Sequence, residues 1–149
     1  MKWTPAMMKW GLRFYGPYVG AGIRVENISQ DWRQMQVSMG LKWFNRNIMG
    51  THFGGSLYSM VDPHLMLMLM QILGKSYQVW DQSAQIDFLV PGKGRVYAEF
   101  KISDKDLEDI LDNTSQGKKH LHQFNVQVFD KEKTVVAETK KIIYVRKKA

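Results

Sequence analysis

The sequence predicts a single α+β domain, residues 1–149, in which an antiparallel sheet wraps around one long buried helix. Two observations carry this prediction. The stretch from about Gly55 to Leu73 is apolar on every face of a helix, and such a helix is buried on all sides. Segments with period-two alternation precede and follow it without regular strand–helix alternation, which indicates a mostly antiparallel sheet. A chain of 149 residues is long enough for one domain with one core.

Residues 1–20 are expected to form a helical segment in front of the sheet. They are rich in aromatic side chains and are interrupted by proline and glycine, which predicts a short helix followed by a turn. The aromatic residues expected to lie on one side and pack onto the main body are Trp3, Trp10, Phe14 and Tyr18. Apolar and polar residues then alternate over residues 23–26 and 35–41, which predicts two half-buried strands joined by residues 30–32.

The long apolar helix that follows is expected to end near Gly74, a good C-terminal stop. Pro63 lies inside it, removes one backbone hydrogen bond and frees the carbonyl of Ser59. Either the helix kinks there, or a second helix begins with Asp62 as N-cap and Pro63 at its first position. We favour one kinked, continuous helix.

The second half of the chain is rich in predicted strands. Ser103 and Asp106 resemble a capping box, which predicts a helical insertion at about residues 103–115. Period-two alternation predicts four strands, two on each side of this insertion. They cover residues 84–88, 96–102, 122–128 and about 134–145.

The formal net charge of +7 indicates a basic surface, with lysine and arginine gathered at residues 118–119, 140–141 and 146–148. Such a surface is either simply solvated or attracts a polyanion such as a nucleotide-bearing ligand. No nucleic-acid recognition motif accompanies the charge, so we expect no nucleic-acid partner.

The compartment is predicted from the absence of cysteine and of hydrophobic targeting segments. A chain without cysteine has no disulfide framework and no thiolate nucleophile, and it fits a reducing compartment. The first residues lack the uninterrupted apolar core of a signal peptide. The window from Gly55 to Leu73 has the length of a membrane span, but a central aspartate alone costs about 2.5–3.5 kcal/mol on insertion. We therefore expect a cytoplasmic protein without a membrane partner.

The order of elements, together with a motif between Asn47 and Asp62, resembles the hotdog-fold thioesterase superfamily, and more narrowly its phenylacetic-acid-type acyl-CoA thioesterases. Their motif is an asparagine, a His-Gly-Gly whose histidine lies six positions after it, and an acidic residue nine positions after that histidine. The matching positions here are Asn47, Phe53, Gly54, Gly55 and Asp62. Residues 86–92 resemble the family's next landmark, a strand that ends in Phe-x-x-Pro. The wider pattern most resembles an uncharacterised thioesterase-like hotdog family.

The resemblance implies hydrolysis of an acyl-CoA or acyl-carrier thioester, with coenzyme A as part of the substrate and no separate cofactor. Amides at a helix start are unpaired and carry the positive end of the helix dipole. The amides of Gly54 and Gly55 would therefore form an oxyanion hole, unless the two glycines only make a tight turn. Asp62 would be the general base, or alternatively only a helix N-cap. Asn47 would orient water or the carbonyl, or would only shape its loop.

The histidine of the family motif is replaced by Phe53, and His52 stands one residue earlier. This offset is either absorbed by the loop, which keeps His52 in the catalytic set, or it points the ring elsewhere. A second function is therefore open, a non-catalytic hotdog protein that binds acyl thioesters. A hotdog dehydratase fits less well, because the spacing between His52 and the carboxylate of Asp62 is too short for that family.

Four residues are expected to contact the substrate. Phe53 and Ser56 lie at the helix start, and Lys93 and Arg95 follow a turn where coenzyme A phosphates would arrive. Hotdog sites resemble clefts between subunits, so we expect a homodimer or homotetramer. His120 and His122 share one strand face at a spacing that suits a metal, but no carboxylate or cysteine partner is evident, so we expect no metal site.

Overall fold

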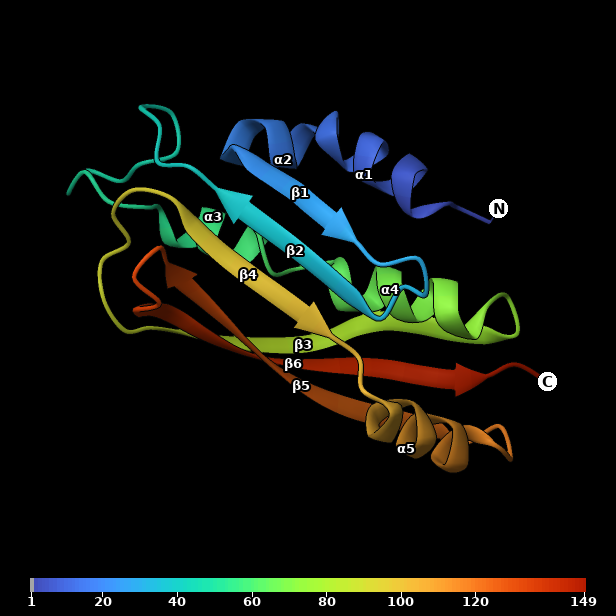
Figure 1. The fold of residues 1–149 in the computed structure, drawn as a ribbon. Helices are drawn as coiled ribbons and strands as arrows, with labels where there is room; N and C mark the ends of the chain where they lie inside the picture. The colour runs from blue at the N-terminus through green and yellow to red at the C-terminus, as the bar shows by residue number, and fades with distance from the viewer. Residues whose placement is uncertain (1) are drawn as a thin grey trace.

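The computed structural model describes residues 2–149, which form one six-stranded antiparallel sheet and five helices (Figure 1). The strand order is β1-β2-β4-β5-β6-β3. The strands are β1 Ile23–Ile28, β2 Gln34–Met39, β3 Tyr77–Phe88, β4 Val96–Lys101, β5 Lys119–Asp130 and β6 Val135–Lys147. This arrangement confirms the predicted α+β class with a helix packed against a single sheet.

The central helix is divided into α3, Gly54–Ser59, and α4, His64–Leu73. The prediction of one continuous helix is wrong at this point. The last amides of α3 turn back to carbonyls three residues earlier, as in the bond from Val61 to Tyr58, and this tightening ends the helix. Pro63 then stands at the N-cap of α4 with no side-chain cap, so the alternative of Asp62 as N-cap is also wrong.

Burial of the central helix differs from the expected all-round burial. Leu65, Met68 and Leu69 of α4 are at most 1% exposed and belong to the main core. Met70 is 44% exposed, and its neighbours Met66 and Leu67 are only partly covered. The sheet therefore covers one side of α4 and leaves an apolar strip at the surface of the single chain.

The N-terminal segment forms α1, Pro5–Arg13, and α2, Gly16–Ala21. The first is the predicted short helix, and the second is a further short helix where a turn was expected. Tyr18 is buried as expected, and its hydroxyl lies 3.0 Å from Nε2 of His64. Trp10 and Phe14 are 60% and 74% exposed and stack on each other instead of packing onto the main body. The prediction for these two side chains is wrong.

The helical insertion is α5, Asp104–Thr114, and its predicted capping box is confirmed. Strand β3 begins at Tyr77, seven residues before the predicted start at residue 84. Its inward positions include Asp81, a carboxylate that follows the inward residues Tyr77 and Val79. None of the helices within residues 2–149 combines the length and the apolar character that a membrane crossing requires.

Candidate functional site

A cavity of about 560 Å³ opens at the start of α3, between the loop that precedes this helix and the segment that follows β3. Both segments come together at one end of the sheet (Figure 1). Most of the lining is apolar. It includes Asn47, His52, Gly54, Leu57, Phe88 and Lys93.

The first amides of α3 lie outside the helix's own hydrogen bonds. Phe53 is the N-cap residue and provides no side-chain cap. The first helical bonds run from Ser56 and Leu57 to the carbonyl of Phe53, at 2.9 and 3.1 Å. Within residues 2–149, no hydrogen-bond acceptor is found for the amides of Gly54 and Gly55. These two donors lie at the positive end of the helix, where Gly54 lines the cavity and Gly55 is the next residue along the chain.

Neither glycine has a positive φ angle, so neither is required for a left-handed turn. A Cβ atom on Gly54 would lie 3.0 Å from the ring of Phe88. A Cβ atom on Gly55 would lie 2.5 Å from the ring of Phe53. Both rings are more than half exposed and lie against the glycines. Phe53, which was expected to contact the substrate, lies beside the start of α3.

Asn47 borders the cavity, but its side chain is used by its own loop. Its Oδ1 accepts the amides of Met49 and Thr51, at 3.0 and 3.1 Å. Its Nδ2 donates to the Thr51 hydroxyl and to the carbonyl of His52, at 3.0 and 3.3 Å. This geometry favours the loop-forming alternative for Asn47.

His52 is 3% exposed and holds the turn at residues 91–94 against the loop before α3. Its amide donates to the carbonyl of Gly92, and Nε2 lies 2.7 Å from the carbonyl of Gly94. Burial lowers the pKa of His52, so the ring is neutral near pH 7 and donates through Nε2. The one-residue offset thus directs Nε2 of the ring toward the turn.

Asp62 belongs to a buried ionic cluster that the sequence analysis missed. Lys141 on β6 is fully buried, and its ammonium lies 2.7 Å from Oδ1 of Asp81 and 3.2 Å from Oδ1 of Asp62. It also donates to the main-chain carbonyl of Asp62. Burial raises the pKa of Asp81, and the lysine opposes this effect. A buried cation needs such partners, since its desolvation is otherwise uncompensated.

The side chain of Asp62 is 46% exposed, so one face of the carboxylate remains accessible. Burial, followed by the charge of Asp62, raises the pKa of Tyr58 to about 12, so this neighbour remains a neutral phenol. Asp62 is not among the residues that line the α3 cavity of the described chain. The structure therefore does not bring Asp62 and Gly54 into one site within a single copy.

Of the other residues predicted to contact the substrate, one lines the cavity and two lie outside it. Lys93 lines the cavity and is exposed. Arg95 does not line it, since its guanidinium donates to the hydroxyl of Ser38 on β2 at 2.9 Å. Ser56 is 8% exposed and lies in the first turn of α3.

Lys141 and Asp81 could have been found from the sequence by extending the strand patterns. Residues 137, 139, 143 and 145 of β6 are all buried, and position 141 belongs to the same inward series. Position 81 continues the inward series of 77 and 79 on β3. A lysine and an aspartate at inward positions of neighbouring strands are the signal of a buried pair.

The family to which the chain belongs is shown by its sequence. The model of a family described as a domain of unknown function, DUF4442, matches residues 4–145, so the chain is a member of that family. No curated protein sequence matches the chain significantly.

Solved structures define the class of fold. PA5026 from Pseudomonas aeruginosa, described as a protein of unknown function and probable thioesterase, superimposes with a TM-score of 0.82 at 17% identity, covering 95% of each chain. Thioesterase HI1161 from Haemophilus influenzae gives 0.69 at 12% identity, over 99% of this chain and 93% of that one. The PaaI protein of the Escherichia coli phenylacetic acid degradation operon gives 0.61 at 13% identity, over 97% and 94%. These likenesses establish the hotdog fold expected from the sequence.

Proposed function

We propose that this protein hydrolyses acyl thioesters at the start of α3. The observation that carries the proposal is the pair of unpaired amides at Gly54 and Gly55, beside a largely apolar cavity. Donors fixed in this way stabilise the negative charge that develops on a thioester carbonyl oxygen during attack by water. The thioesterase names of several structures with the same fold support the choice of substrate class.

The cavity and the charges around it suit the parts of an acyl-CoA. Its apolar lining would receive the acyl group or the pantetheine arm. Lys93, at the exposed side of the cavity, would attract the phosphates of coenzyme A. Water would attack the carbonyl carbon, Asp62 would accept a proton from this water, and the thiolate would leave and take up that proton.

The base and the amides would come from two copies of the chain. Strand β3 lies at the edge of the sheet, and of the described strands only β6 pairs with it, so one of its edges is free for a second copy. Its Asp81 touches the Lys141–Asp62 cluster, while Phe88, at its end, covers Gly54. Antiparallel pairing of two β3 strands about a two-fold axis would bring the Asp81 half of one strand beside the Phe88 half of the other. Asp62 of one copy would then approach Gly54 of the partner subunit.

A second function has observations of its own. The motif histidine is Phe53, His52 is held by the turn carbonyls, and Lys141 engages one oxygen of Asp62. These features favour a protein that binds acyl thioesters without turning them over.

A thiol-release assay with acyl-CoA esters of graded chain length separates the two functions. If Asp62 is the base, Asp62→Asn lowers turnover by about 100- to 10,000-fold while ester binding survives. Asp112→Asn removes the same charge from an exposed position on α5, away from β3, and serves as the matched control. Binding without turnover by the unmodified protein would establish the binding function instead. Turnover that Asp62→Asn leaves unchanged would exclude Asp62 as the base.

A further inference from the structure

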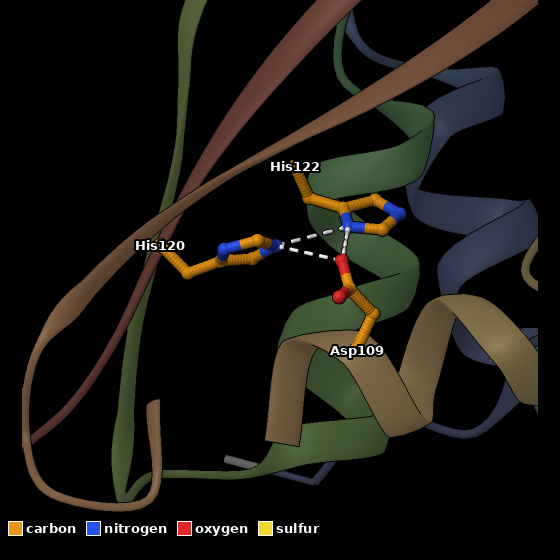
Figure 2. A group of neighbouring side chains, drawn as sticks. All are labelled: Asp109, His120 and His122. Carbon is orange, nitrogen blue, oxygen red and sulfur yellow. Dashed lines mark hydrogen bonds and ion pairs between the residues drawn. The ribbon is translucent and has the colours of Figure 1, made fainter. Parts of the chain in front are cut away.

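A second polar cluster lies between α5 and β5, toward the opposite end of the sheet from α3 (Figure 1). Asp109 of α5 faces His120 and His122 of β5 (Figure 2). The atoms that converge are Oδ2 of Asp109, Nε2 of His120 and Nδ1 of His122, and each pair is separated by 3.2 Å. The expectation that the two histidines have no carboxylate partner is therefore wrong, because the helical insertion supplies one.

When both imidazole rings are neutral, they carry too few N–H donors to give a hydrogen bond to every facing atom of this cluster. The Nε2 atom of His122 lies 2.9 Å from Oδ1 of Asp106 and donates its proton there, which leaves only a lone pair on Nδ1. The proton on Nε2 of His120 can point at one neighbour at a time. At least two of the three atoms then face each other with lone pairs, and no proton between them, at 3.2 Å. A cation placed between the three atoms would remove this unfavourable contact.

The spacing of the three atoms suits a tetrahedral metal ion. Zinc binds histidine nitrogen and carboxylate oxygen at about 2.0–2.1 Å, and ligands at the corners of such a tetrahedron are about 3.3 Å apart. The observed separations are close to this value. Two histidines at alternate positions of one strand and an aspartate from a facing helix are also a ligand set that zinc accepts.

The surroundings of the cluster have the form of a metal site. Asp106 orients His122 through the ring nitrogen that would not bind the metal, as carboxylates commonly do behind metal-binding histidines. Asp106 is itself fixed by the amide and the hydroxyl of Ser103 in the capping box. The side chains of His122 and His120 are 10% and 18% exposed, and that of Asp109 is 49% exposed, so an ion can enter from the solvent side.

We propose that Asp109, His120 and His122 bind one divalent transition-metal ion of the zinc class, with the fourth position open to water or to an exogenous ligand. The ion would join the helical insertion to β5. Nothing in the proposed thioester chemistry depends on it, so the two sites can be tested separately.

The test uses protein purified without a histidine tag and stripped with EDTA, followed by calorimetric titration with zinc chloride at neutral pH. We expect one ion per chain, and a visible spectrum of tetrahedral Co²⁺ when cobalt replaces zinc. His120→Ala and Asp109→Ala should abolish binding, and Asp106→Asn should weaken it roughly 10- to 100-fold. Asp112→Asn, on the same helix and without a role in the cluster, should bind like the unmodified protein.

Folding of each variant is checked by circular dichroism and by its thermal midpoint, and Asp109→Ala keeps the test valid because the replaced carboxylate is largely exposed. Absence of zinc and cobalt binding by the folded, unmodified protein would overturn the proposal. Binding that survives both His120→Ala and Asp109→Ala would overturn it as well.

Discussion

Two regions lie next to β3, the start of α3 and the cluster of Lys141, Asp62 and Asp81. In the proposed thioester hydrolysis they would have different tasks. Near Phe88, the start of α3 offers hydrogen-bond donors without acceptors and a cavity in front of them. Near Asp81, a buried lysine holds two carboxylates, one of which is half-exposed. The first region can stabilise an anion and the second can accept a proton. Because they are separate in one chain, the proposed thioester hydrolysis would need two chains.

The largest effect on stability is expected at the carboxylate region. Lys141→Met leaves Asp62 and Asp81 without their cation, and breaking a buried ion pair costs about 3 kcal/mol of unfolding free energy. Lys140→Met removes the same charge from an exposed neighbouring position and should leave stability nearly unchanged. Urea unfolding of both variants measures the difference. Equal stabilities would show that the ammonium of Lys141 is not a structural element of the cluster.

The stability of the carboxylate region should also depend on pH. His64 is buried at the start of α4 and is affected by the charges of Lys141 and Asp62. Burial lowers the pKa of His64 to about 3 in the folded state, below the value of 6.5 that applies when it is exposed. The unfolded chain therefore binds the extra proton first, and this contribution to stability is lost as the pH falls from about 6.5 toward 3, by about 1.4 kcal/mol per pH unit.

His64→Leu should flatten this part of the pH profile, since the replacement has no proton to bind. Denaturant unfolding of both proteins between pH 6.5 and pH 4.5 measures the two slopes. Parallel slopes would mean that His64 contributes nothing to the loss.

The smallest effect is expected at the cavity. Lys93→Gln should raise the KM for acyl-CoA esters by up to about five-fold at low salt, because a single exposed charge contributes little. The increase should vanish at high salt, where exposed charges are screened. Arg95→Gln is the control, since Arg95 is engaged with Ser38 outside the cavity. A salt-independent KM in all three proteins would argue for a carrier protein or another ligand.

The sequence predicted those features that depend on local pattern. Alternation located the strands, and the Ser103–Asp106 capping box located α5. Other features depend on contacts between residues distant in sequence, such as the 79 positions between Asp62 and Lys141. The carboxylate that faces His120 and His122 comes from a helix that no strand pattern could place against them. The direction of the His52 ring likewise depends on a turn about 40 residues later.

Mixing two inactive variants tests the shared site most directly. Asp62→Asn removes the base, and Gly55→Val blocks the approach to the amides, since a Cβ atom there already meets the ring of Phe53. If each site combines Asp62 of one copy with Gly55 of the partner subunit, every hybrid dimer contains one intact site. Equal amounts of the two variants, unfolded and refolded together, should then recover about a quarter of the unmodified activity. No recovery in demonstrated hybrid dimers would contradict a site built from two copies.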